Sequence, residues 1–125
     1  LPDEEAKATA WDAMFGGDGS ADLSNYLFIA TAHGFWQPEQ ADLLRQYVPR
    51  YYKDAVAVGA RRGPAMADAA GRHAFPVYAV DADALRLGED CLRDGEPVPS
   101  LRRRLADQLD DLARALRVRE GQPEG

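Results

Sequence analysis

The stretch "LRRRLADQLDDLARAL" (Leu101–Leu116) carries the clearest structural pattern in this chain of 125 residues. Leucine recurs along it at spacings of four and three residues, at Leu101, Leu105, Leu109, Leu112 and Leu116. Arginine, aspartate, alanine and glutamine fill the other positions. This spacing places the leucines on one face of an α-helix and the charges on its other faces. The pattern predicts a long helix, introduced by residues 97–100, that buries its leucine face around Leu105 and Leu109.

The beginning of the chain also carries helix signals. Pro2 suits a first helical turn, and the acidic residues 3–5 suit the positive end of the helix dipole. Gly16-Gly17 ends this first helix. After a connection over residues 16–22, we expect a second helix over about 24–34.

The middle of the chain continues in the same way. A third helix begins at residues 37–39, and Pro49 then disfavours helical geometry at the residue before it. We therefore expect a kink or a restart at Pro49, with the helix resuming to about Arg62. A short alanine-rich helix follows over about 63–74, and Asp81 is suited to cap a further helix that ends at residues 94–95.

These signals define an all-α fold of about six or seven helices, because no segment alternates apolar and polar residues for long enough to indicate a strand. We expect a single helical domain over residues 1–125. Short connections make neighbouring helices antiparallel, so helix pairs should stack either as a HEAT-like α-solenoid or as a superhelical bundle. No fixed-period repeat in the sequence separates these two arrangements.

Composition narrows the class of protein. Hydrophobic residues make up 46% of the chain and charged residues 29%, which is typical of a globular domain. No apolar run approaches the length of about 20 residues that a membrane span needs, and no signal peptide opens the chain. The net charge of −6 argues against nucleic acid as a partner. A lone cysteine, Cys91, suits a reducing compartment, so a cytoplasmic location is expected.

The sequence predicts no catalytic residue, metal ligand or cofactor site in this chain. His33 and His73 lie far apart in sequence, and neither belongs to an H-E-x-x-H zinc motif. His33 is interpreted as a hydrogen-bonded packing residue. No serine lies in a G-x-S-x-G nucleophile motif, and Cys91 is interpreted as a small core residue.

Several segments together resemble a known family. They are "AW" (10–11), "LSNYLF" (23–28), "GFWQPEQADLL" (34–44), "YVPRYY" (47–52) and the closing "LRRRLADQLDDLARALR" (101–117). In this order and spacing they resemble the C-terminal helical domain of the aminopeptidase N family of zinc metallopeptidases, in the form found in high-GC bacteria. The resemblance extends over almost the whole chain, which opens Leu1-Pro2 without a methionine.

The resemblance implies a parent protein with a separate catalytic domain upstream. That domain carries the zinc site of the H-E-x-x-H type and a glutamate-containing motif for the substrate amino group, and neither matches any position here. The family's C-terminal domain is a bowl of HEAT-like antiparallel helices. It caps the catalytic domain, encloses a chamber and contacts the far end of the peptide. This chain would be the last part of that bowl, and its partners would be the catalytic domain of the same chain and the peptide substrates.

The aromatic stretch Leu23–Tyr52 is interpreted as a seam of helix packing. Some of Tyr47, Tyr51 and Tyr52 should be exposed where further helices would dock. Aromatic and cationic side chains are the candidates for peptide contact or a domain interface: Trp36, Arg50, Tyr51, Arg61, Arg62 and Arg102. The alternative is a free-standing helical adaptor that binds a protein partner through its aromatic face.

Overall fold

The structure is a computed structural model that describes residues 1–16 and 22–121. Within these ranges it contains seven α-helices, one 3₁₀ turn and no strand. The helices are α1 (Pro2–Phe15), α2 (Asn25–Phe35), α3 (Ala41–Leu44), α4 (Tyr47–Arg62), α5 (Pro64–His73), α6 (Ala82–Asp94) and α7 (Pro99–Arg119), with the 3₁₀ turn η1 (Pro38–Gln40) before α3. The predicted all-α fold class is confirmed. Most of the expected connection over residues 16–22 lies outside the described residues.

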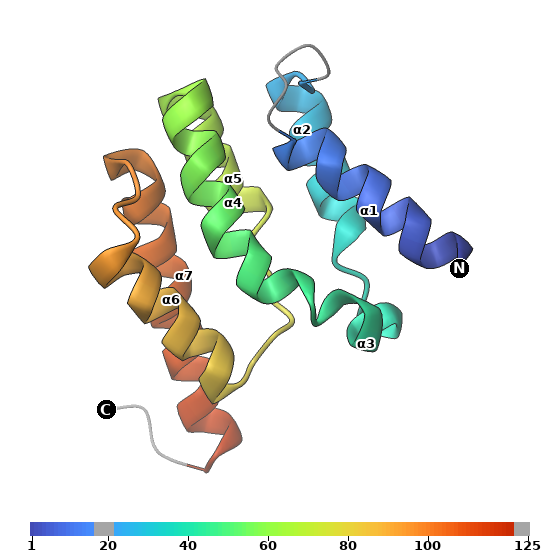
Figure 1. Cartoon of the computed structure of the whole chain (residues 1–125). Helices are drawn as coiled ribbons and strands as arrows, with labels where there is room; N and C mark the ends of the chain where they lie inside the picture. Colours follow the sequence, from blue (N-terminus) through green and yellow to red (C-terminus); the bar gives the residue numbers. More distant parts are fainter. Residues whose placement is uncertain (17–21, 122–125) are drawn as a thin grey trace.

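The long helices form antiparallel pairs that lie side by side in two layers (Figure 1). The pairs are α1–α2, α4–α5 and α6–α7. Helices α1, α4 and α6 form one layer, and α2, α5 and α7 form the layer behind it. The α4–α5 pair is central, since α5 packs against α2 on one side and α7 on the other.

Two helices begin directly after a residue whose side chain caps the helix, Ser24 for α2 and Asp81 for α6. The Ser24 hydroxyl accepts a hydrogen bond from the backbone N–H of Leu27 over 3.2 Å. The Asp81 carboxylate accepts one from the N–H of Ala84 over 2.8 Å, which confirms its predicted capping role. Each bond satisfies a donor that has no partner inside its helix.

The helix restarts close to Pro49, which is one of the two expected outcomes, but Val48 is helical, contrary to the expectation for the residue before this proline. Helix α3 ends at Leu44, residues 45–46 turn, and α4 begins at Tyr47. Pro49 is therefore the third residue of α4, where a missing amide donor costs no intrahelical bond. The break lies upstream of the proline because its ring excludes the carbonyl one turn earlier.

Aromatic side chains fill the space between the α1–α2 pair and α4. The ring of Trp11 lies 4.5 Å from that of Phe15, 5.1 Å from that of Phe35 and 5.0 Å from that of Tyr47, centroid to centroid. Its indole N–H also donates to the Asp54 carboxylate over 2.7 Å. The interpretation of the aromatic stretch as a packing seam is confirmed, because the contacts of Trp11 with Phe35 and Tyr47 join α1 to α2 and α4.

The expectation that some of Tyr47, Tyr51 and Tyr52 are exposed is wrong. Their exposed fractions are 3%, 0% and 5% respectively. Helix α4 lies in the middle of its layer, between α1 and α6, and α5 packs behind it. These three side chains therefore face neighbouring helices of the same chain, so none of them is available for a further helix to cover.

The leucine face of α7 is buried as its spacing predicts. Leu101 and Leu105 are fully buried, Leu109 and Leu112 nearly so, and Arg103 points to solvent. Helix α7 uses this face against both α5 and α6.

Replacement of Leu105 by alanine should destabilise the chain by about 2–5 kcal/mol, because it leaves a cavity in a fully buried site. Arg103→Ala is the matched control on the exposed face of the same helix and should change the free energy of unfolding by less than about 0.5 kcal/mol. Urea denaturation of both variants measures the two effects. A larger effect of Arg103→Ala than of Leu105→Ala would show that the face assignment is reversed.

Glycine allows the close approach of α7 to α5. A Cβ atom added at Gly71 would lie 2.5 Å from the Cβ of Arg104 and 3.2 Å from a methyl group of Leu101. Both neighbours belong to α7, and Cβ of Arg104 is held close to its backbone. The two helices would have to move apart to admit any side chain at Gly71.

Gly71→Ala should therefore destabilise the chain by about 1–3 kcal/mol, the usual cost of overpacking. Gly34 in α2 is the control, because a Cβ there would meet nothing within 4 Å. Gly34→Ala should stabilise the helix by up to about 1 kcal/mol through its higher helix propensity. Denaturation midpoints that move in the same direction for both variants would contradict this account of the α5–α7 contact.

Candidate functional site

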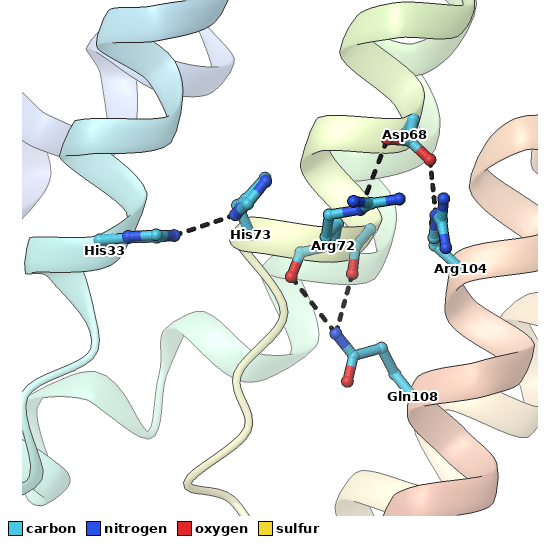
Figure 2. Close-up of polar contacts among 7 residues, drawn as sticks. His33, Asp68, Arg72, His73, Arg104 and Gln108 are labelled. Carbon is cyan, nitrogen blue, oxygen red and sulfur yellow. Dashed lines mark hydrogen bonds and ion pairs between the residues drawn. The ribbon is translucent and has the colours of Figure 1, made fainter.

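Polar side chains from α2, α5 and α7 lie along one layer of the molecule, and we call them the polar row (Figure 2). The polar row consists of His33 from α2, Asp68, Arg72 and His73 from α5, and Arg104 and Gln108 from α7. It crosses both helix borders of this layer, so it links parts of the chain that are distant in sequence.

The border between α2 and α5 is crossed by a pair of imidazoles. His33 Nε2 and His73 Nδ1 lie 2.9 Å apart, and the ring centroids are 5.0 Å apart. In this hydrogen bond one ring nitrogen donates and the other accepts, so the accepting ring must be neutral at that atom. His33 is exposed and His73 is half-buried. The prediction that His33 is hydrogen-bonded is confirmed, but it lies at the surface, and its partner was not found from the sequence.

The surroundings of His73 favour its neutral form. Desolvation lowers its pKa below the ordinary value of 6.5, and the positive charges of His33 and Arg72 act in the same direction. The carboxylate of Asp68 opposes them without reversing the shift. His73 is therefore uncharged at neutral pH and can offer a lone pair to its neighbour.

The border between α5 and α7 is crossed by an ion pair. Arg104 Nε donates to Asp68 Oδ1 over 2.6 Å, and Arg72 Nε lies 3.7 Å from Asp68 Oδ2. The hydrogen bond from Arg104 is the main reason that the pKa of Asp68 lies below its usual value. Gln108 adds a second link, since its amide donates to the backbone carbonyl of Gly71 over 3.2 Å.

Acidification should weaken the folded state through His73. Because its folded pKa is below 6.5, the unfolded chain takes up a proton first as the pH falls through about 6.5. The free energy of unfolding then decreases until the pH passes below the folded pKa. Urea denaturation at pH 7.5 and pH 5.5 should show this loss of stability.

The control for this prediction is His73→Gln, which keeps a polar side chain and does not titrate. Its stability should change less between pH 7.5 and 5.5 than that of the parent sequence. The carboxylate of Asp68 does not confuse the comparison, because its pKa lies below 3.8. An equal loss in both proteins would show that His73 is not the titrating group.

Two of the candidate residues predicted from the sequence pack between helices, Tyr51 fully buried and Trp36 partly buried. The indole N–H of Trp36, directly after α2, donates to the carbonyl of Ala74 over 2.8 Å. The hydroxyl of Tyr51 in α4 donates to the carbonyl of Ala70 over 2.8 Å, and burial raises its pKa. Both side chains hold the end of α5 in place.

Two further candidates lie at the C-terminal end of α4. Arg61 donates to the Asp22 carboxylate over 2.6 Å and to the carbonyl of Gly16 over 2.9 Å. Arg62 Nε lies 3.8 Å from the same carboxylate, and its Nη1 is buried without a hydrogen-bond partner among the described residues. These arginines join α4 to the residues that flank the connection between α1 and α2.

The remaining two candidates are separate from the others. The guanidinium of Arg50 lies over the rings of Tyr47 and Trp11, 5.1 and 5.7 Å from their centroids. Arg102 Nη1 donates to the carbonyl of Leu92 over 2.9 Å. The predicted residues therefore do not converge on one site, and their contact with a peptide or another domain stays a prediction.

Within residues 1–16 and 22–121, no three His, Cys, Asp or Glu side chains are placed to hold one metal ion. Cys91 is buried, as predicted, and desolvation raises its pKa, so the thiolate is disfavoured. In the same part of the chain, none of the helices has the length and apolar character to cross a membrane.

The fold is thus an all-α row of helix pairs, and its polar groups are engaged with one another across helix borders. No protein-family model matches the chain. Over 117 residues the chain is 33% identical to Aminopeptidase N from Streptomyces lividans. This alignment covers 94% of the chain and 13% of the Streptomyces protein, so the chain spans only a small part of that relative's length.

Proposed function

We propose that this chain is a C-terminal helical cap segment of a zinc aminopeptidase of the aminopeptidase N type, an enzyme that removes N-terminal residues from peptides. The observation that carries this proposal is the 33% identity to Aminopeptidase N, which extends over 94% of the chain. The likeness therefore covers all the helix pairs. The high-GC bacterial form and a cytoplasmic location belong to the same proposal.

In this proposal the segment encloses the chamber of the parent enzyme and helps to hold the peptide, with no catalysis of its own. The arrangement of antiparallel pairs in two layers supports it, because stacking such pairs in series produces a curved HEAT-like solenoid. The catalytic domain of the same chain and peptide substrates are the proposed partners.

The zinc centre of the proposed parent does not fit the residues of this chain. His33 and His73 belong to different helices, and no glutamate and second histidine follow either of them in the H-E-x-x-H spacing. No third ligand joins them among the described residues. The proposal therefore assigns zinc and its general base to another domain, and no catalytic step is assigned to this segment.

The burial of the aromatic side chains favours the cap proposal over the adaptor alternative. An adaptor of the kind considered needs an exposed aromatic face. Trp11, Phe28, Phe35 and the three tyrosines of α4 are instead buried against neighbouring helices. Tyr26 is an exception, with 78% of its side chain exposed.

Removal of this segment from the proposed parent should leave zinc binding intact. The chemical step depends on the metal-bound water and its base, whereas enclosure affects how the substrate is held. The truncated enzyme should lose more kcat/KM on a decapeptide than on a single-residue chromogenic substrate. Metal analysis and kcat/KM for both substrates, with and without the segment, measure this difference.

The outcome that would contradict the proposed role is an equal loss of kcat/KM on both substrates. Such a result would assign the segment to general stability alone. Thermal denaturation of the truncated enzyme should accompany the kinetics, so that unfolded protein is not counted as inactive enzyme. Loss of zinc from a truncated protein that remains folded would also contradict the proposal.

A further inference from the structure

We propose that His33 and His73 together form a binding site for a divalent transition-metal ion, which would bridge α2 and α5 at the protein surface. The fold brings together both histidines of the chain, from positions 40 residues apart. Figure 2 shows the two rings directed at each other across the helix border. Imidazole is a good ligand for zinc, copper and nickel, so the shared donor atoms define the class of ion.

The separation of the two nitrogens suits a chelated ion. Metal–nitrogen bonds of about 2.0–2.1 Å place two adjacent ligand atoms about 2.9 Å apart at a right angle and about 3.4 Å apart in a tetrahedron. The distance between His33 Nε2 and His73 Nδ1 is 2.9 Å. In the present hydrogen bond the two nitrogens face each other, so both rings would have to rotate to direct their lone pairs to one ion, which the exposed position of His33 and the half-buried position of His73 allow.

Proton occupancy at neutral pH also permits metal binding. In the hydrogen-bonded pair one proton lies between the two nitrogens. For both nitrogens to coordinate an ion, the donating imidazole would shift this proton to its other ring nitrogen, so that each neutral ring offers a lone pair. The ion would then need to displace one hydrogen bond at an exposed position, which is a small cost.

The charged neighbours explain why the site would have two protein ligands only. Asp68 is the acidic group that acts on His73, and its oxygens are engaged by Arg104 and Arg72. The positive charge of Arg72 repels a cation, but the side chain is half exposed, so solvent and salt screen this repulsion. Water would therefore complete the coordination, unlike in a catalytic zinc site with its three protein ligands.

Such an ion would act as a clamp between the first and second helix pairs. It would bind the folded chain more tightly than the unfolded chain, in which the two histidines are separated, and would therefore raise the stability of the fold. This inference is independent of the proposed aminopeptidase parent, since it concerns two side chains within the described structure.

The test uses the untagged chain and zinc chloride, with binding measured by isothermal titration calorimetry and thermal denaturation at pH 7.5. We expect one zinc ion per chain, a higher Tm with zinc, and reversal by a chelator. Copper(II) electron paramagnetic resonance should show two nitrogen ligands. Magnesium should not raise the Tm, because it prefers oxygen ligands. Zinc affinity should fall at pH 5.5, where protons compete for the imidazoles.

Variants distinguish this site from nonspecific binding. His33→Ala and His73→Ala each remove one of two ligands and should weaken zinc binding by about tenfold or more. Arg103→Ala is the control, since Arg103 lies on the exposed face of α7 and its replacement removes no imidazole, and its zinc affinity should equal that of the parent sequence. Equal zinc affinity in all variants, or no zinc-dependent change in Tm of the parent sequence, would overturn the proposal. Circular dichroism confirms that each variant remains helical.

Discussion

The last turn of α5 is the point on which the arrangement of the three helix pairs depends. Carbonyls at the end of a helix run out of donors within the helix, although that of Ala70 still accepts from the N–H of Ala74 over 3.3 Å. Side chains from the neighbouring elements add donors here: Tyr51 of α4 donates to Ala70, Gln108 of α7 to Gly71, and Trp36 after α2 to Ala74, the residue that follows α5. Buried carbonyls must be satisfied, so these bonds fix where each neighbour lies relative to α5.

Close packing around α5 makes these bonds possible. The buried face of α5 consists largely of small residues, and Gly71 allows the backbone of α7 to approach. On the other side, a Cβ at Gly59 of α4 would lie 3.0 Å from that of Ala67. With larger side chains at these positions, the donors of α4 and α7 would lie too far from the carbonyls of α5. The shape of the short helix thus determines its hydrogen bonds.

Periodicity and capping signals predicted the elements well, since they depend on residues close in sequence. The leucine face of α7, the cap at Asp81 and the break near Pro49 are all of this kind. The burial of the α4 tyrosines was not predicted, because it depends on α1, α5 and α6 covering them from three directions. The pairing of His33 with His73 was missed for the same reason. No local pattern indicates that two single histidines on separate helices share a border.

The two helix borders of the α2, α5 and α7 layer differ in a way that bears on function. An ion pair and a glycine contact join α5 to α7. The ion pair persists across the neutral pH range because Asp68 remains ionised, and the glycine contact involves no titrating group. The α2–α5 border instead includes an imidazole pair in which desolvation holds the pKa of His73 below 6.5, so that this ring gains its charge only on acidification. In a row of stacked pairs, the angle at each border sets the curvature of the whole row. If the segment encloses a chamber, the α2–α5 border is therefore the place where pH or a metal ion could alter the shape of that chamber without disturbing the core.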